Sequence, residues 1–256
     1  MTSLFDVGKS AIQAYRQSLS VTGQNIANIN TDGYVRREAD LQEVTASQGG
    51  ITSIANQSGL GVRVADIRRS FDELLTDRKL SASSNYEQSD SFLKQVEKLE
   101  DLLLPGESDL GSQIASFFRA LNDVAAAPSD LAPRAVAIES GNSLADAFNS
   151  TAVQLEQLKQ ATLDRTEEAV DSLNTLTKEL ASVNDRILSA SQSGRSPNSL
   201  LDLRDKLIGE ISKLADITAS YTDRGVANIT VGSSGVGPSL ITGNKSTNVG
   251  FIERYD

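Results

Sequence analysis

Apolar residues recur at seven-residue steps along the first thirty positions of the chain. Phe5, Ile12, Leu19 and Ile26 take the first core position of four successive heptads, and the second core position is mixed in size and polarity. This period predicts a helix over residues 3–29 with one apolar seam, which is typical of helices that pair with other helices. The residues expected to form an assembly interface are Phe5, Ile12, Tyr15, Leu19, Ile26 and Ile29.

Two different environments would produce such a seam. An amphipathic helix that packs only on its own domain also carries apolar residues along one side. The 3.5-residue period and the turn-forming cluster at residues 30–33 favour pairing with another helix instead. Both interpretations stay open at the level of periodicity.

The rest of the chain alternates between strand-like and helix-like patterns. Alternating segments at 39–44 and 61–67 flank a Gly- and Ser-rich loop at 47–61, which predicts a β-hairpin. Alternation returns near the C-terminal end of the sequence, at 218–222 and 226–231. Between these regions, 3.6-residue periods predict helices over 71–104, 114–124, 133–193 and 199–214. Ser199 is the predicted N-cap of the last helix.

These patterns predict a mainly α protein. We expect an elongated antiparallel helical bundle with an N-terminal heptad helix, a short β-hairpin region and the start of a β-rich domain. Because the sequence stops without a final helix or cap, we also expect it to be part of a longer chain. The predicted domains are the heptad helix (1–33), the extended or hairpin region (34–70), the helical bundle (71–215) and the β-rich start (216–256).

Composition narrows the chemistry available to the chain. It holds no cysteine and no histidine, so a disulfide framework, a thiolate nucleophile and a Ser-His-Asp triad are excluded within it. No apolar run approaches the roughly 18 residues of a membrane helix, and no cleavable signal is apparent. The net charge of −10 makes nucleic acid and anionic membranes poor partners.

Acidic clusters are the remaining candidates for catalysis. Glu97, Glu100 and Asp101 lie at helical spacing from Lys94 and Lys98, which is typical of a solvated, salt-bridged helix face. No loop has the ligand spacing of a calcium site, so neither a metal nor a cofactor is predicted. A hydrolase working with two carboxylates stays an alternative, which a pocket with two facing carboxylates would favour.

A dense charged patch begins the last predicted helix. Asp202, Arg204, Asp205 and Lys206 lie within five positions of each other. Salt bridges within the protein explain such a patch, and a role at an interface is the alternative.

A sequence motif ends the first predicted helix. Residues 18–36 have the sequence SLSVTGQNIANINTDGYVR. This stretch resembles the N-terminal motif of flagellar rod, hook and hook-associated proteins, a family in which Leu-x5-Asn-Ile-Ala-Asn-x2-Thr-x-Gly-Tyr recurs. The matching positions here are Asn25, Ile26, Ala27, Asn28, Thr31, Gly33 and Tyr34.

Two further stretches resemble the hook-associated members of this family. Residues 61–72 are similar to the segment that leads into their helical domain. Residues 196–207, with the sequence SPNSLLDLRDKL, are similar to a signature that rod and hook subunits lack. The matching positions are Pro197, Asn198, Leu200, Leu201, Asp202, Arg204 and Asp205.

The resemblance implies a structural, non-enzymatic subunit at the junction between the flagellar hook and filament, exported by the type III apparatus without a cleaved signal. The implied partners are the hook protein, a second junction protein, copies of itself and, for the full-length protein, an export chaperone. It also implies pairing of the first helix with a C-terminal helix, which this sequence lacks. Another axial protein, such as a distal rod or hook subunit, and a generic coiled-coil protein are the alternatives.

Overall fold

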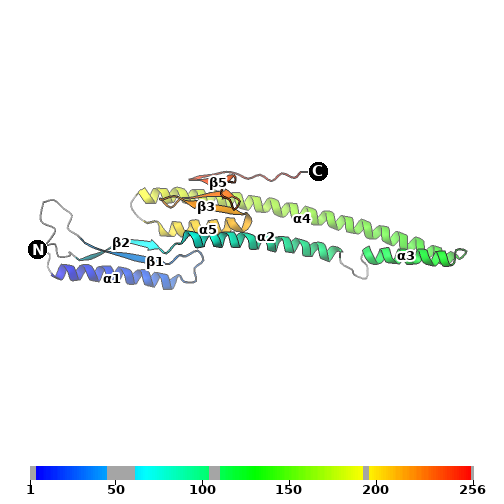
Figure 1. The fold of residues 1–256 in the computed structure, drawn as a ribbon, viewed down its shortest axis with the longest axis horizontal. Helices are drawn as coiled ribbons and strands as arrows, with labels where there is room; N and C mark the ends of the chain where they lie inside the picture. The colour runs from blue at the N-terminus through cyan, green and yellow to red at the C-terminus, as the bar shows by residue number, and fades with distance from the viewer. Residues whose placement is uncertain (1–3, 45–60, 104–109, 193–195, 255–256) are drawn as a thin grey trace. The chain divides into compact units, whose positions relative to one another are not determined.

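Helices dominate the chain, as its periodicity predicts (Figure 1). The computed structural model describes residues 4–44, 61–103, 110–192 and 196–254. Within these ranges, no helix is both long and apolar enough to cross a bilayer. The helices are α1 (Leu4–Ala27), α2 (Glu73–Leu103), α3 (Leu110–Ala126), α4 (Leu131–Gln192) and α5 (Asn198–Leu214). The strands are β1 (Arg37–Glu43), β2 (Val62–Arg69), β3 (Ile217–Tyr221), β4 (Ala227–Val231), β5 (Ser239–Thr242) and β6 (Lys245–Ser246).

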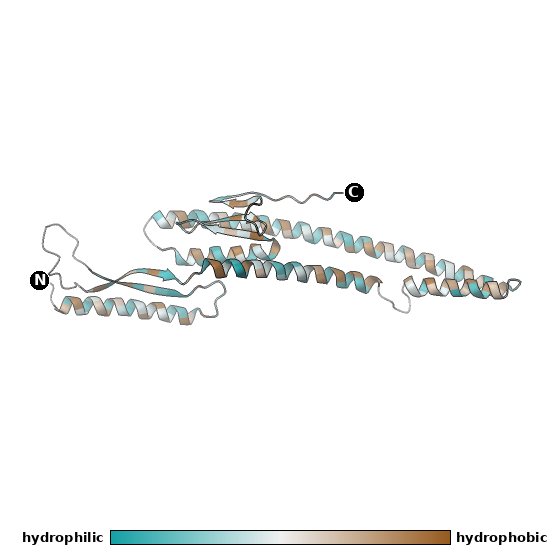
Figure 2. Cartoon of the chain, viewed as in Figure 1, coloured by the Kyte–Doolittle hydropathy of each residue, from teal (hydrophilic) through white to brown (hydrophobic). Residues whose placement is uncertain are grey.

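The long helices are amphipathic rather than uniformly apolar. Hydrophobic and hydrophilic residues are interleaved along each of them (Figure 2). A helix of this kind buries one stripe and leaves the remainder to solvent or to a partner. The mainly α fold with a hairpin and a later small sheet is therefore as predicted.

β1 and β2 form the predicted antiparallel hairpin. Arg37 pairs with Arg69 at one end and Glu43 with Val62 at the other, with an irregularity between Asp40 and Leu41. The loop predicted between the strands falls almost wholly outside the described residues.

The described chain forms two compact units. One comprises the residues up to Ser84 together with Leu173–Val249, and the other comprises Asn85–Ser172 with the residues from Gly250 onward. These units differ in extent from the four predicted domains, which remain a proposal about how the whole protein is organised.

The core of the first unit lies between the C-terminal part of α4, α5 and a four-stranded sheet. The sheet has the order β3-β4-β5-β6, and each neighbouring pair is antiparallel. Its strands bring their apolar residues to the same cluster as α4 and α5, so sheet and helices share one core (Figure 1). Fully buried members of this cluster are Leu180, Ile187, Ile208, Ile211, Ile229 and Ile241.

A polar side chain joins α4 to the sheet inside this core. Asn184 is fully buried. Its Nδ2 donates to the carbonyl oxygens of Ala227 and Gly243, at 2.8 and 2.7 Å, and its Oδ1 accepts from the Ala227 N–H at 3.2 Å. The side chain therefore satisfies backbone groups at which strand pairing ends.

The start of α5 differs from the prediction of a Ser199 cap. The helix begins at Asn198, Pro197 takes the cap position, and no side chain caps the helix. The polar side chains at this end bond to the hairpin instead. Asn198 Nδ2 donates to the Ile67 carbonyl oxygen at 2.6 Å, and the Ser196 hydroxyl donates to Asp66 at 2.8 Å.

The second unit contains the strongest charge imbalance in the chain. Residues 85–172 hold sixteen acidic and six basic side chains, so they account for the entire net charge of −10. In this unit α3 packs on α4 at Gly141, where a Cβ would lie 3.4 Å from the Phe117 ring. The glycine gives the aromatic ring room to approach.

Candidate assembly interface

The first helix, α1, has three distinct faces. The face toward the hairpin consists of small or slender side chains, with Ala14 and Val21 buried and Val7, Ser10 and Ser18 partly buried. Small side chains let a helix approach a hairpin closely. This face fits the interpretation in which α1 packs on its own domain.

The second face of α1 is apolar and exposed. Phe5 is 89% exposed, Leu19 72% and Ile12 63%, although each is large and hydrophobic. Contiguous exposed apolar side chains are typical of surfaces that contact a partner. All six residues predicted to form the assembly interface, namely Phe5, Ile12, Tyr15, Leu19, Ile26 and Ile29, lie on this exposed seam.

The third face of α1 is polar and also exposed. It includes Gln13, Gln17, Ser20 and Gln24. With 3.6 residues per turn, this face lies roughly a third of the circumference from the seam. The chain therefore separates two exposed faces by polarity, and the apolar seam is distinct from ordinary helix surface.

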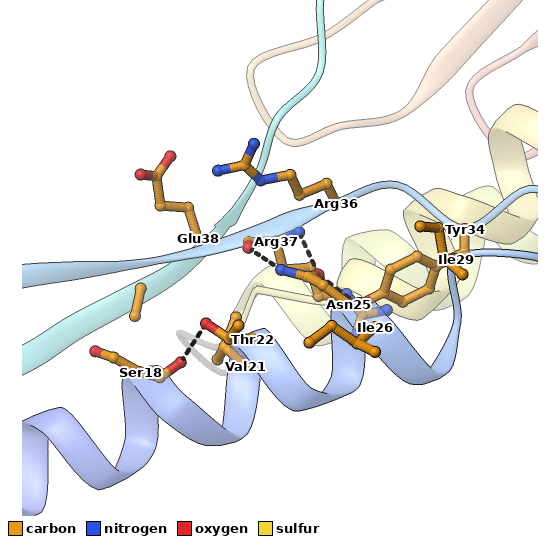
Figure 3. Close-up of a pocket in the computed structure, with 11 residues that line it drawn as sticks. Ser18, Val21, Thr22, Asn25, Ile26, Ile29, Tyr34, Arg36, Arg37 and Glu38 are labelled. Carbon is orange, nitrogen blue, oxygen red and sulfur yellow. Dashed lines mark hydrogen bonds between the residues drawn. The ribbon is translucent and has the colours of Figure 1, made fainter.

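Two hollows accompany the seam. Near its start, an open hollow of about 590 Å³ lies beside Gly8, between Phe5 and Ile12. At its other end, a groove of about 570 Å³ lies between α1 and β1, and Ile26 and Ile29 line it (Figure 3). Hollows between apolar side chains are where the side chains of a facing helix insert.

Asn25, a residue of the N-terminal motif, fastens α1 to the hairpin. Its Nδ2 donates to the Arg37 carbonyl oxygen at 2.8 Å, and its Oδ1 accepts from the Arg37 N–H at 2.9 Å (Figure 3). The same Oδ1 accepts from the Tyr34 hydroxyl at 2.8 Å. The Arg37 guanidinium also lies over the Tyr34 ring, 5.0 Å from its centre.

The asparagine acts on the free edge of β1. The Arg36 carbonyl oxygen accepts from Ser70 N–H at 2.8 Å, toward the partner strand. Because backbone groups alternate in direction along an antiparallel strand, those of Arg37 point away from β2. Asn25 thus pairs with both backbone groups of Arg37 as a neighbouring strand would, whereas Asn198 binds only the carbonyl oxygen of Ile67 on β2, whose N–H donates to Asp66.

We expect Asn25→Asp to loosen α1 from the hairpin. A carboxylate cannot donate to the Arg37 carbonyl oxygen, and an unsatisfied buried group costs about 1–3 kcal/mol. Hydrogen exchange of the α1 and hairpin amides should therefore accelerate. Asn30→Asp, the same change on an exposed side chain past the helix end, should leave exchange as in the parent protein. Equal exchange in both variants would contradict this role of Asn25.

The other end of α1 is fastened by Ser10. Its hydroxyl donates to the Val7 carbonyl oxygen at 2.8 Å and accepts from the Val62 N–H at 3.2 Å. Gly61, which precedes this contact, has φ of +114°, and a Cβ there would lie 2.1 Å from the Ser10 hydroxyl oxygen. The helix is thus bonded to both strands, once near each end.

The second motif, at the start of α5, binds the hairpin through a network of charged side chains. Asp202 contacts Arg37 Nη2 at 2.9 Å through Oδ2, and Arg69 Nε at 2.8 Å through Oδ1. The second of these is an ion pair without hydrogen-bond alignment. Asp205 is bound by Arg69 and by Arg204, the latter at 2.6 Å. All five side chains are at most 19% exposed, so they are only weakly screened by solvent.

Arg204 connects this network to the sheet, at the turn between β3 and β4. It donates to the Gly225 carbonyl oxygen and lies over the Tyr221 ring, 4.5 Å from its centre. Phe71 meets Tyr221 edge to face at 5.5 Å. Burial, reinforced by the charge of Asp205, raises the pKa of the Tyr221 phenol. The phenol is therefore neutral at physiological pH, and the ring serves as a packing surface for the guanidinium.

The remaining motif residues shape turns and packing. Gly33 has φ of +79°, a conformation that favours glycine, and a Cβ there would lie 3.2 Å from Lys206 Cβ. The Asn28 side chain bonds the Gln24 carbonyl oxygen and accepts from the Thr31 hydroxyl, which closes the turn after α1. Ala27 is exposed, while Leu200 and Leu201 pack against the core cluster.

The carboxylates that line a cavity in the described part of the chain lie in ion pairs. Among the described residues, no three acidic side chains converge in a way that could hold a metal ion. One cavity of about 320 Å³ is lined by three carboxylates, but each has a cationic partner. The pairs are Asp32 with Lys206, Asp205 with Arg69 and Arg204, and Glu210 with Lys213.

Comparison with known families identifies the fold. A family model described as "Flagellar hook-associated protein FlgK helical domain" matches residues 96–256, which is more than half of the chain. The chain belongs to the FlgK family of flagellar hook-associated proteins. A second model, "Flagella basal body rod protein", matches residues 5–34, which include α1 and the motif that follows it.

This FlgK-family chain is similar to hook-associated proteins of several bacteria. It is 28% identical to "Flagellar hook-associated protein 1" of Escherichia coli K12 over 98% of its length, and 28% identical to the Bacillus subtilis 168 protein of that name over 96%. It spans about half the length of these relatives, 45% and 50% respectively.

A solved structure is similar as well. "The structure of the flagellar hook junction protein FlgK from Burkholderia pseudomallei" matches with a TM-score of 0.59 and 26% identity, over 66% of this chain and 29% of that one.

In this FlgK-family chain the two motifs meet in space. Asn25 of the first binds the backbone of Arg37, and Asp202 of the second binds its guanidinium. Of the linking arginines, Arg37 lies outside the stretches that carry the resemblance and Arg69 lies within the stretch 61–72, but periodicity singles out neither of them. The available signal was weak: each belongs to an Arg-Arg pair at a strand end, and the carboxylates of Asp202 and Asp205 lie one helical turn apart.

Proposed function

We propose that this protein is a structural, non-enzymatic subunit of the junction between the hook and the filament of the bacterial flagellum. In this role α1 is an axial helix whose exposed seam packs on helices of neighbouring subunits. The observation that carries the proposal is the seam itself, which stays exposed although α1 is fastened to its own hairpin by another face.

The family supports a location in the flagellum, and the residue types of the chain support a structural role. A FlgK-family subunit works in the flagellum, and the solved relative is titled a hook junction protein. The proposed partners are the hook protein, a second junction protein and further copies of the same chain. We also propose export through the flagellar type III apparatus, with a chaperone bound to the full-length protein.

The distribution of charge favours α1 over the second unit as the contact between copies. Residues 85–172 carry a net charge of −10, so two such stretches repel each other at close range. The α1 seam consists of uncharged residues and lacks this penalty. Another axial role, such as distal rod or hook subunit, is less well supported because the helical-domain match is to FlgK.

A photo-reactive phenylalanine analogue at Leu19 tests the proposal. We expect it to form adducts with axial subunits in assembled flagella, because Leu19 lies at the middle of the exposed seam. The adducts would be identified by mass spectrometry of purified hook–filament junctions.

The matched control places the same analogue at Gln17, which is exposed on the polar face of the same helical turn. We expect far fewer adducts there. Equal adduct yields at the two positions, or none at Leu19 in cells that bear filaments, would overturn the assignment of the seam as an interface.

A further inference from the structure

The α1 helix and the hairpin form an arm whose attachment to the rest of the first unit is polar. We define the arm as residues 4–44 and 61–69. None of its residues belongs to the buried apolar cluster of α4, α5 and the sheet. The described contacts from the hairpin to α5 are ion pairs and hydrogen bonds, made chiefly by Arg37 and Arg69 with Asp202 and Asp205.

The two carboxylates are placed to hold both strands at once. Asp202 and Asp205 are three positions apart on α5 and so lie on one side of the helix. Asp202 reaches Arg37 on β1 and Arg69 on β2, whereas Asp205 reaches Arg69 alone among the arm residues. Asp202 is therefore the side chain that ties the two strands to α5 together.

We propose that Asp202 and Asp205 with Arg37 and Arg69 are an electrostatic latch that sets the direction of the arm, and with it the direction of the α1 seam. Arg37 and Arg69 are positioning residues in this latch. Through the bonds of Asn25 to the Arg37 backbone, the orientation of α1 follows that of Arg37. The latch itself is a property of the free protein, and its importance for assembly rests on the proposed junction role.

Polar attachment has a different consequence from apolar packing. Apolar packing of the arm would be insensitive to the charge of Asp202, whereas ion pairs depend on it, and at these mostly buried side chains counterions screen the charges only weakly. Asp202→Asn keeps the size of the side chain and removes its charge, so the arm loses its shared anchor while the apolar core is untouched. Arg37→Gln removes the ion pair between β1 and the same Asp202 carboxylate.

Spin labels measure the direction of the arm directly. The sequence has no cysteine, so two can be introduced without background, at Gln17 on α1 and at Ser220 on β3, both exposed. We expect a narrow distance distribution in the parent protein and a wider one in Asp202→Asn and in Arg37→Gln. The double variant should give a distribution no wider than that of Asp202→Asn, because Arg37→Gln removes a contact that Asp202→Asn has already broken.

Hydrogen exchange supplies a second readout. Exchange of the hairpin amides in Asp202→Asn should rise about tenfold, the change expected from losing a charge-assisted contact of ordinary strength. The melting of the apolar core, followed by circular dichroism, should stay close to that of the parent. Glu210→Gln, which breaks an exposed pair with Lys213 on the same helix, should change neither exchange nor the distance distribution.

The latch is overturned if Asp202→Asn gives the parent distance distribution, or if Glu210→Gln widens it equally. Its role in assembly is tested separately in the full-length protein by counting filaments. Reduced filament attachment in Asp202→Asn, together with the wide distribution, supports that role. Normal attachment with the wide distribution overturns the role in assembly and leaves the latch in the free protein established.

Discussion

Changing Ile12, Leu19 and Ile26 together to aspartate is expected to abolish attachment of the filament to the hook. The three side chains occupy the same position of successive heptads, and all are exposed on the α1 seam. In a helix–helix interface they would be buried, where an unpaired charge costs far more than the apolar contact it replaces. Filament counts by electron microscopy of cells that make the full-length variant would show the loss.

The same variant should keep its fold. None of the three residues belongs to the core cluster, and the α1 contacts with the hairpin come from a different face. We expect the variant to melt as the parent does. The matched control is Gln17→Asp, Ser20→Asp and Gln24→Asp, which adds the same charge on the polar face of the same helix. Filaments on cells with the seam variant, or their loss with the control, would refute the seam hypothesis.

Asn184→Leu is expected to have the largest effect on stability. The side chain is fully buried and makes three hydrogen bonds to the backbone of Ala227 and Gly243. Leucine has a similar volume but leaves those groups unsatisfied, at a cost of about 1–3 kcal/mol for each. Because domains are stable by only about 5–15 kcal/mol, the first unit should be largely unfolded near body temperature.

Urea denaturation followed by circular dichroism measures this loss. Asn244→Leu is the control, since Asn244 is exposed and its side chain bonds only Asp185 at the surface, at 3.0 Å. We expect that variant to denature within about 0.5 kcal/mol of the parent. A midpoint for Asn184→Leu equal to that of the control would mean that the core relaxes to satisfy these backbone groups without the amide.

The two asparagine predictions share a physical cause. Asn25 and Asn184 each pair with both the N–H and the C=O of one residue, Arg37 and Ala227 respectively. An amide is the side chain that can donate and accept in this geometry. At Arg37 the amide substitutes for a missing neighbouring strand on the free edge of β1, and at Ala227 it joins β4 to Gly243, just past the end of β5.

The heptad spacing of α1, the period of the long helices and the alternation of β1 and β2 are local patterns. They depend on residues within a few positions of each other, so these elements, and the apolar positions that α1 leaves exposed, are predictable without a structure. The same is true of the chemistry that is ruled out by the absence of cysteine and histidine. The motifs indicated the family to which the chain is similar.

The contacts that each motif makes depend on tertiary packing, because their partners lie far away in the sequence. Arg37 and Asp202 are 165 positions apart, and no local pattern pairs them. Likewise, Ser199 has the features of an N-cap, but the polar side chains at that end of α5 bond to the hairpin. The sheet of β3 to β6 shares a core with α4 and α5 because apolar strand faces need cover, and the long-range packing of these elements chose which helices supply it.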